Sequence, residues 1–280
     1  MRLIAGSTAW RYATLLARRV PLNHALWRAC EAGVLAEVPM ERPILDIGCG
    51  DGLFASLLFE QPVECGIDLK ISHLTRARES GAYRDVKVAD ATRLPFDAGS
   101  FGTVFSNSVL EHIPDIDAVC REVARVLRPG GQLVFTVPSD HFGEFLFWPA
   151  VLRALGLGPL AAFYAGSMNR VFVHHHTDGA DRWRARLERA GLELVVDRQI
   201  MPRPLHALWD LLMPFAALQL LLRRAWRGWP YPLQRACLPL ARGALEPLLE
   251  PRGRPGANLI VVARKPVAGG MPVRSGGSAG

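Results

Sequence analysis

Residues 43–52 read Pro43-Ile-Leu-Asp-Ile-Gly-Cys-Gly-Asp-Gly52, an apolar run that ends in three closely spaced glycines. The run predicts a buried strand over 43–47, and the pattern that follows predicts a helix over 53–60. Glycines between a strand and a helix let the chain turn sharply and let a ligand lie against the main chain. The dinucleotide fingerprint G-x-G-x-x-G requires a glycine where Leu53 stands. The stretch therefore predicts a ligand site of a different kind in an α/β fold.

Strand and helix patterns alternate regularly from residue 43 to residue 138. Further strands are predicted at 63–67, 86–89, 101–106 and 132–137, and helices at 71–80 and 115–127. Asp115 stands at the N-cap position of the second of these helices, and Arg128-Pro-Gly-Gly131 ends it. Such alternation predicts a doubly wound, mostly parallel sheet with its ligand at the carboxyl ends of the strands.

Acidic residues end the first three strands: Asp46, Asp68 and Asp90. The carboxyl ends of parallel strands meet at one edge, so the three are expected to converge on one crevice. Asp68 is placed to bind ribose hydroxyls, and Asp90 to accept from an adenine amino group. Asp46 and Asp51 flank the glycine loop, which disfavours pyrophosphate and suits a ligand with cationic groups, such as S-adenosylmethionine. The alternative is that Asp46 or Asp90 only caps the following turn.

Five blocks occur in order: Leu45-Asp-Ile-Gly-Cys-Gly-Asp-Gly52, Gly66-Ile-Asp68, Asp90-Ala-Thr-Arg-Leu-Pro-Phe96, Ser106-Asn-Ser-Val-Leu-Glu-His112 and Leu127-Arg-Pro-Gly-Gly131. With these blocks the chain resembles a class I S-adenosylmethionine-dependent methyltransferase of the UbiE-like methyltransferase domain group. The resemblance covers residues 43–138, with weaker support from 174–200 and 257–265. It implies a Rossmann-like fold with a mostly parallel seven-stranded sheet, to which this chain adds apolar helical insertions.

The resemblance also implies the residues that bind the cofactor, S-adenosylmethionine. It implies that the methionine part is bound by Asp46, by the backbone of Gly48, Cys49 and Gly50, and by Asn107. It implies that the ribose is bound by Asp68, and the adenine by Leu69, Asp90 and the backbone of Ala91.

Methyl transfer from a sulfonium is an in-line displacement, so the enzyme mainly positions the nucleophile and, where needed, removes a proton. The candidate bases are His112 and, within the run His174-His-His176, His175. Glu111-His112 occurs in family members with different acceptors, which favours a structural role for His112. Adjacent histidines point in different directions, and no carboxylate or cysteine stands at ligand spacing, so no metal site is predicted.

The chain divides by pattern into seven segments. They are an N-terminal helical lid (1–42), the cofactor-binding core (43–138), an apolar acceptor-side insertion (139–177), a core helix and strand (178–200), a basic apolar helical insertion (201–256), a last strand (257–265) and a disordered tail (266–280). The core has a net charge of −4 and the second insertion +5, so the basic excess lies outside the core. The lid is either a cover over the cofactor or part of the same surface as the second insertion.

The second insertion contains an uncharged stretch, residues 211–222, between Asp210 and Arg223. Twelve residues are too few to cross a bilayer as a helix, which takes about twenty. Aromatic and basic residues surround the stretch: Trp209, Trp226, Trp229, Tyr231, Arg223, Arg224, Arg227 and Arg235. Tryptophan beside arginine is typical of a helix on an anionic membrane surface, and the alternative is a helical cap that closes an apolar pocket. Both interpretations indicate a hydrophobic acceptor.

Cysteines and the N-terminus indicate a cytoplasmic location, with peripheral contact with the inner face of the membrane left open. The five cysteines form no C-x-x-C pair, which disfavours a disulfide framework, and arginines interrupt residues 1–20, which disfavours a signal peptide.

The leading hypothesis is O- or C-methylation of a hydrophobic or lipid-linked small molecule. The alternatives are methylation of RNA or another macromolecule, and a non-catalytic S-adenosylmethionine-binding scaffold on membranes. No nucleic-acid partner is expected, because basic residues alternate with aliphatic stretches and no RNA-binding module is recognised. The oligomeric state is left open.

Overall fold

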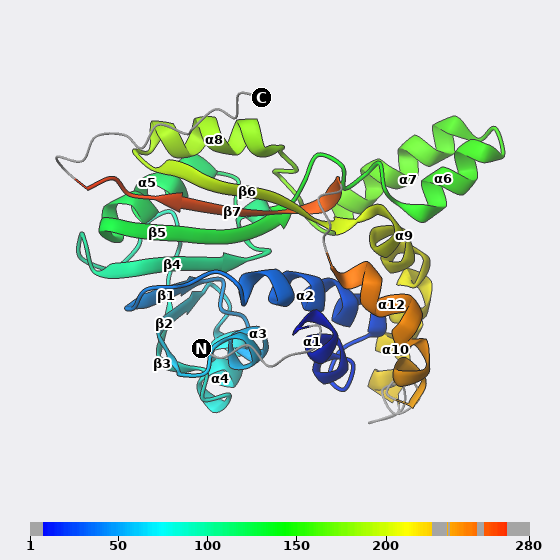
Figure 1. Ribbon diagram of the computed structural model, residues 1–280, viewed down its shortest axis with the longest axis horizontal. Helices are drawn as coiled ribbons and strands as arrows, with labels where there is room; N and C mark the ends of the chain where they lie inside the picture. The colour runs from blue at the N-terminus through cyan, green and yellow to red at the C-terminus, as the bar shows by residue number, and fades with distance from the viewer. Residues whose placement is uncertain (1–7, 226–233, 235, 251–254, 268–280) are drawn as a thin grey trace, which may run out of the picture.

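The computed structural model describes residues 8–225, 234, 236–250 and 255–267 of the 280-residue chain. They form one seven-stranded sheet with the strand order β3-β2-β1-β4-β5-β7-β6 (Figure 1). The strands are β1 (Ile44–Ile47), β2 (Val63–Asp68), β3 (Tyr83–Val88), β4 (Phe101–Asn107), β5 (Leu127–Pro138), β6 (Glu193–Pro202) and β7 (Gly256–Arg264). Neighbours from β3 to β5 run parallel, whereas β7 runs antiparallel to β5 and β6. The predicted doubly wound, mostly parallel seven-stranded sheet is confirmed.

Helices cover both faces of the sheet, as parallel strands require. On one face lie α5 (Ile116–Val126) and α8 (Ala180–Arg189), and on the other α2 (Leu22–Leu35), α3 (Leu53–Leu58) and α4 (Ile71–Glu79) (Figure 1). Alternate residues of β1 join different hydrophobic cores: Leu45 and Ile47 pack with α5 and α8, and Ile44 with α2. Burial on both faces is the reason why this strand reads as a continuous apolar run.

Local signals place most element ends correctly. The predicted N-cap of α5 is confirmed, because Ala118 N donates to Asp115 Oδ1 over 3.0 Å. Two strands begin earlier than predicted: β3 at Tyr83, which pairs with Val63, and β5 at Leu127, which pairs with Phe101. Charged residues in β3 and glycines in β5 interrupt the apolar pattern there, while the main chain continues to pair.

The predicted N-terminal lid corresponds to α1 (Thr8–Leu16) and α2, which pack against each other. Most of α2 is buried, including Leu26, Cys30 and Leu35. The helix also contacts α3, β6 and the later helix α9 (Arg203–Leu211). It is therefore part of the body of the fold, and its polar side chains reach the site described below.

Both apolar insertions are helical. The first contains α6 (Phe147–Ala154) and α7 (Gly158–Val171), a pair that projects from the body (Figure 1). The second contains α9, α10 (Met213–Ala225) and α12 (Arg242–Leu249), with a short 3-10 helix η2 (Leu238–Ala241). Another 3-10 helix, η1 (Leu110–His112), follows β4. Within the described ranges, no helix is both long enough and apolar enough to cross a membrane.

The uncharged stretch 211–222 is divided between two helices, because α9 ends at Leu211 and α10 begins at Met213. Asp210 is buried and accepts hydrogen bonds from Tyr164 Oη and Trp148 N, so it fastens the end of α9 to α6 and α7. In contrast, Phe215 and Leu218 of α10 are exposed. Several residues of the predicted surface lie outside the described residues or have undescribed side chains: Trp226, Trp229, Tyr231, Arg223, Arg224, Arg227 and Arg235, together with the tail from 268.

Candidate functional site

Two cavities lie at the carboxyl ends of β1 and β4. The first, here the loop cavity, has a volume of about 150 Å³ and is lined by the glycine turn from Gly48 to Asp51, by Asp46 and by α2. The second, here the aromatic cavity, has about 100 Å³ and is lined mainly by aromatic side chains. His24 and Arg28 of α2 line both cavities, which therefore adjoin.

The glycine turn leaves its main chain open to a ligand. Gly48 and Gly50 both have positive φ angles, +77° and +56°, which favour glycine. A Cβ atom at Gly48 would meet the Val109 side chain at 2.4 Å, whereas one at Gly50 would meet no atom within 4 Å. Gly48 is thus required for packing, and Gly50 borders the space in which a ligand lies against the backbone.

Asp46 is a buried carboxyl group at the floor of the loop cavity. Tyr83 Oη donates a hydrogen bond to Asp46 Oδ2 over 2.6 Å. Burial raises the pKa of Asp46 to about 7, opposed by the Tyr83 hydrogen bond and reinforced by the Asp68 charge. A cationic group in the loop cavity would favour the ionised form, so the site fits a ligand that carries an ammonium or sulfonium group.

Asp68 and its neighbours form the open end of the site. Asp68 Oδ2 accepts from Gly50 N at 3.1 Å, and Asp68 Oδ1 accepts from Lys70 N at 2.8 Å. Beside it, Leu69 is 67% exposed, and Val88, the register partner of Asp68, is 55% exposed. An apolar ledge beside a carboxylate suits a purine nucleoside, whose base is flat and whose ribose carries hydroxyl groups. The fit to S-adenosylmethionine thus extends from the loop cavity to this ledge.

Two further predicted residues are already engaged with the protein. Asp90 Oδ1 accepts from both the N–H and the hydroxyl of Thr92, which is the turn-capping arrangement. Asn107 lines the loop cavity, but its Nδ2 donates to Glu31 Oε2 and its Oδ1 accepts from Thr136 Oγ1. Contacts of either residue with a cofactor stay predictions, as does the role of the buried Ala91.

Glu31 of α2 is a buried carboxylate that the sequence analysis missed. It accepts hydrogen bonds from β4, β5 and β7 and from its own helix, through Trp27 Nε1, Arg28 Nη1, Asn107 Nδ2, Ser108 Oγ, Thr136 Oγ1 and Asn258 Nδ2. Burial alone would raise the pKa of Glu31, but the Arg28 charge and these hydrogen bonds lower it. The carboxylate therefore holds α2 against the strand ends.

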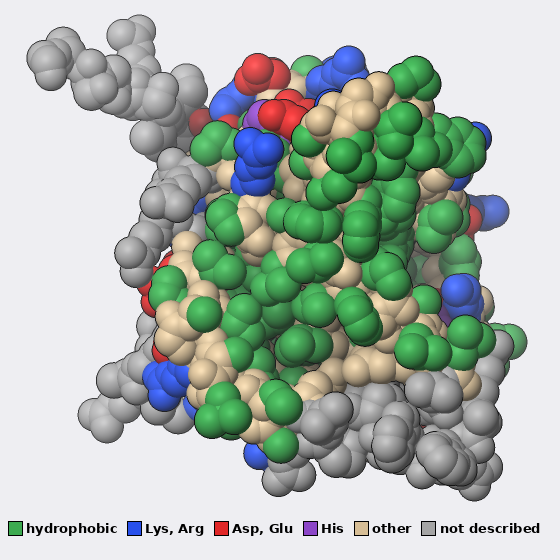
Figure 2. Space-filling model, turned by 90° about the vertical axis from the view of Figure 1, so that its right-hand side faces the viewer, with side chains coloured by type: hydrophobic (Ala, Val, Ile, Leu, Met, Phe, Trp, Pro, Cys, Tyr) green, Lys and Arg blue, Asp and Glu red, His purple; other side chains and the backbone are tan. Residues whose placement is uncertain are grey.

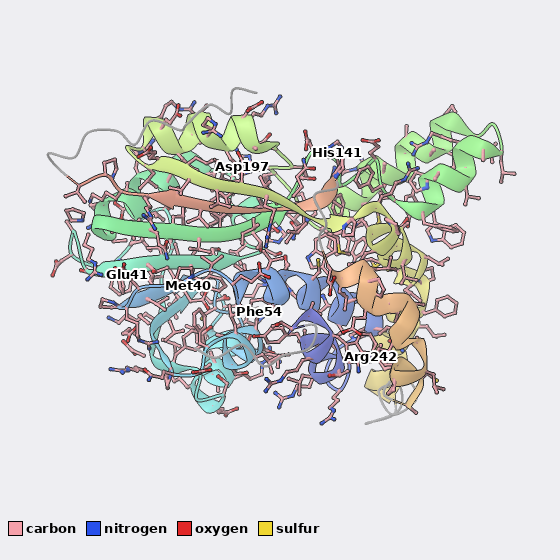
Figure 3. The ribbon with its side chains drawn as sticks, viewed as in Figure 1. Met40, Glu41, Phe54, His141, Asp197 and Arg242 are labelled. Carbon is pink, nitrogen blue, oxygen red and sulfur yellow. The ribbon has the colours of Figure 1, made fainter. Side chains whose placement is uncertain are left out.

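The sequence contains a spacing pattern that could have predicted the face of α2 that lines the site. His24, Trp27, Arg28 and Glu31 follow the spacing i, i+3, i+4 and i+7, which places them on one face of the helix. Burial, together with the Arg28 charge, lowers the pKa of His24 to about 4, so the imidazole is neutral. Arg28 lies over the ring of Phe54, at 5.8 Å from its centroid, on the side of α3 that faces α2 (Figure 3).

The tryptophan and phenylalanine rings of the aromatic cavity come from four separate segments of the chain. They come from α2 (Trp27), the loop after β5 (Phe142), the end of α7 (Phe172) and α9 (Trp209). The ring centroids of Trp27 and Trp209 lie 5.1 Å apart, and those of Phe142 and Trp209 lie 6.0 Å apart. Such a lining suits an apolar or aromatic ligand.

Of the candidate bases, His112 lines the aromatic cavity and His175 does not. His174 takes that place, while His175 is exposed and uses its backbone N–H to donate to Glu111 O over 2.8 Å. The turn depends on Val173, a β-branched residue with φ +54°, whose carbonyl oxygen lies 3.2 Å from His112 Nδ1. This sparsely populated conformation sends Phe172 and His174 to the cavity, a result that sequence patterns do not predict.

Apart from Arg28, which is ion-paired with Glu31, the titratable side chains of the aromatic cavity are neutral near pH 7. Burial lowers the pKa of His174 to about 4 and lowers that of His112 below its ordinary value. Burial also raises the pKa of Glu111 to about 8, and Glu111 Oε2 has no hydrogen-bond partner. Neutral imidazole nitrogens accept hydrogen bonds, so both histidines can orient a hydroxyl-bearing ligand, while the low pKa makes His174 the weaker base of the two. Among the described residues, no group of three or more His, Cys, Asp or Glu side chains is placed to hold a metal ion.

Known methyltransferases are similar to this chain in sequence, chiefly over its cofactor-binding core. Residues 45–135 match the family model of a methyltransferase domain. A demethylmenaquinone methyltransferase from Mycolicibacterium vanbaalenii is 34% identical over 178 residues, which cover 59% of this chain and 74% of the relative. A ubiquinone biosynthesis O-methyltransferase from Aromatoleum aromaticum is 37% identical over 117 residues, which cover 40% of this chain and 49% of the relative. The chain spans about half the length of several curated relatives that it matches.

A solved structure shares the fold over most of its length. It is an S-adenosylmethionine-dependent methyltransferase from Thermotoga maritima, described as a possible histamine N-methyltransferase. The TM-score is 0.52 at 16% identity, and the match covers 92% of this chain and 91% of the other. At such low identity the likeness shows the fold alone, so the acceptor has to be inferred from the cavities.

Proposed function

Because this chain belongs to the class I S-adenosylmethionine-dependent methyltransferases, we propose that it methylates a small lipophilic acceptor held in the aromatic cavity. One observation carries the proposal: His24 and Arg28 line both the loop cavity and the aromatic cavity. A cofactor in the first cavity and an acceptor in the second would thus meet beside the same two side chains. Proximity of this kind accounts for much of the catalysis when the donor is already activated.

The loop cavity and the ledge are the proposed cofactor site. Asp46 and the backbone of Gly48, Cys49 and Gly50 bind the methionine part, and Asp68 binds the ribose. Leu69 contacts the adenine, with Asp90 and Ala91 at its edge. Asn107 supports this site through Glu31. Supporting evidence is the buried carboxyl group of Asp46 together with the open space over Gly50.

Bound S-adenosylmethionine supplies a methyl group that is activated by its sulfonium. The chain has to orient the acceptor and, for an oxygen nucleophile, take its proton. We assign the orientation of the acceptor to His174 and the removal of its proton to His112, since both are neutral and line the aromatic cavity. His174 replaces His175 in this proposal, since His175 lies outside the cavity lining. Arg28, paired with Glu31 at 2.9 Å, lines both cavities where they adjoin and leaves the methyl group and the acceptor to meet beside it.

The acceptor is proposed to be a hydrophobic or lipid-linked molecule with a ring hydroxyl or an activated ring carbon. Support comes from the aromatic lining and from relatives that are named for menaquinone and ubiquinone. An apolar cavity beside the cofactor site favours a small acceptor over RNA, and a catalyst over a scaffold. A cytoplasmic location belongs to the same proposal.

Calorimetric titration with S-adenosylhomocysteine tests the cofactor site, with NADH as the control. We expect saturable binding of the first ligand alone. Transfer of labelled methyl from S-adenosylmethionine is then measured with hydroquinone acceptors, one with an isoprenoid tail and one without. Product with either quinol supports the proposal, and the tailed acceptor is expected to have the lower KM. Absence of S-adenosylhomocysteine binding by the folded protein would contradict it.

A further inference from the structure

Apolar side chains gather on the face of the molecule formed by the helical insertions. Figure 2 shows this face, on which hydrophobic side chains form a broad area with few charged ones. Exposed members come from the α6–α7 pair and from α10: Leu157, Phe163, Val171, Phe215, Leu218 and Leu221. Contiguous apolar surface of this kind marks an interaction site rather than ordinary solvent-facing surface.

The exposed charges that the structure describes on these helices have one sign. Together α6, α7, α9 and α10 contain five arginines, of which the side chains of Arg153, Arg170 and Arg203 are described and exposed, and one acidic residue, Asp210. Asp210 is buried and hydrogen-bonded to Tyr164 and Trp148, so no acidic side chain of the four helices reaches solvent. The segment 43–138, in contrast, has a net charge of −4. The combination of apolar and basic side chains on these four helices is complementary to an anionic lipid surface.

Arginine and aromatic side chains meet on this face. The guanidinium of Arg170 lies over the ring of Phe163, 5.9 Å from its centroid, and both residues are exposed. An aromatic ring below a guanidinium suits the interface between acyl chains and charged headgroups, where the ring enters the apolar layer and the cation stays at the phosphates.

The helices of the face also reach the aromatic cavity. Phe172, directly after α7, lines the cavity, and the residues on either side of it, Val171 and Val173, are exposed. Trp209, another cavity residue, belongs to α9 of the second insertion. The same helices therefore form the face and part of the cavity wall, which gives a membrane-embedded acceptor a short path to the cavity.

We propose that the α6–α7 pair and α10 dock on an anionic lipid bilayer and admit a lipid-phase acceptor to the aromatic cavity. The role as an entrance rests on the proposed function, whereas the docking itself does not. A second copy of the chain is a poorer occupant of the face, because the exposed arginines of α6, α7 and α9 in two copies would repel each other.

Sedimentation with sucrose-loaded vesicles tests the docking. The vesicles consist of phosphatidylcholine alone or of phosphatidylcholine mixed with phosphatidylglycerol. We expect binding to the mixed vesicles that weakens as salt is raised, and little binding to neutral ones. Val171→Asp and Leu218→Asp should weaken the vesicle affinity by about tenfold, by placing an acid against the anionic surface.

Val195→Asp is the matched control, because Val195 is an exposed valine of β6, outside the insertions. It should bind vesicles as the wild type does. Equal affinity of all three variants, or no preference for anionic lipid, would overturn the docking. So would a wild-type dimer that Val171→Asp converts to monomer in sedimentation velocity, since the occupant would then be a second copy. S-adenosylhomocysteine binding, measured on the same samples, separates failure of the docking from failure of the proposed function.

Discussion

Asn258 of the last strand donates a hydrogen bond of 2.7 Å to Glu31 Oε1, across 227 residues of sequence. The same carboxylate accepts from Asn107 of β4 and Thr136 of β5, so it joins α2 to three strands of the sheet. A buried charge with this many donors is stable only while all of them stay in place. The position of α2, and with it the wall shared by both cavities, depends on this one side chain.

Glu31→Ala should lower the free energy of unfolding by about 3–5 kcal/mol, because it leaves Arg28 and several buried donors without their acceptor. Glu31→Gln keeps the shape and loses the charge, so its effect should be smaller. Urea denaturation gives both values. Glu37→Gln is the control: Glu37 is exposed, and its ion pair with Arg198 is worth about 0–1 kcal/mol. If Glu31→Ala changed stability no more than the control does, the assigned role would be wrong.

Gly50→Ala should abolish or strongly weaken S-adenosylhomocysteine binding, because its Cβ occupies the space over the glycine turn. Gly81 is a matched control, since it also has a positive φ angle (+68°), and its Cβ would likewise meet no atom within 4 Å. Both substitutions should cost about 1 kcal/mol of stability from backbone strain. Calorimetry should then find normal affinity in Gly81→Ala alone. Equal affinities in the two variants would place the cofactor elsewhere.

Cofactor affinity should rise as the pH is raised through 7. The carboxyl group of Asp46 has its pKa raised to about 7 by burial, so it is largely protonated below that pH and cannot pair with the ammonium of the ligand. Asp46→Asn should remove this pH dependence and bind weakly at all pH values. Titrations on both sides of pH 7 measure the slope, and a slope of the opposite sign would exclude Asp46 as the partner of the cation.

The raised pKa of Asp46 also makes the free energy of unfolding depend on pH. A carboxyl group whose pKa is higher in the folded state than in the unfolded state favours folding at low pH, and this contribution is lost as the pH rises through the folded-state value. The free energy of unfolding should therefore decrease between pH 4 and pH 7 relative to Asp46→Asn. Urea denaturation of the two proteins over this range checks the difference.

Asp68→Asn should weaken S-adenosylhomocysteine binding by about 1–3 kcal/mol, the scale of a charge-assisted hydrogen bond. Asp90→Asn should have a smaller effect, because Asp90 is exposed and one of its oxygens already caps the Thr92 turn. Calorimetry at one pH compares the two. A larger loss in Asp90→Asn would assign the main nucleoside contact to Asp90 instead.

Substitution of the histidines separates the two neighbours in the triplet. His174→Asn should lower kcat by roughly tenfold, the scale of one lost hydrogen bond to the acceptor, with normal S-adenosylhomocysteine affinity. His175→Asn should leave kcat unchanged, since its side chain is outside the aromatic cavity lining. Initial rates at saturating cofactor measure the effects. A loss of kcat in His175→Asn alone would restore the prediction made from the sequence.

The sheet and the acidic loop were predictable because their signals are local. An apolar strand, a glycine turn and an aspartate follow one another within ten residues, and the order of such units fixes a parallel sheet. The N-cap at Asp115 has the same local character. The aromatic cavity was not predictable, since its rings come from four segments that only tertiary packing brings together. The choice between His174 and His175 depended on the positive φ angle of Val173, which the sequence does not indicate because valine rarely adopts such an angle.

The place of β7 has a consequence for the newly made chain. This strand follows all the other described strands in sequence, yet it lies between β5 and β6 in the sheet. During translation, β5 and β6 therefore emerge from the ribosome well before the strand that joins them, and the edges that will pair with β7 stay open until it follows. Glu31 likewise lacks the hydrogen bond from Asn258 until then. The wall shared by the two cavities is thus completed only late in synthesis.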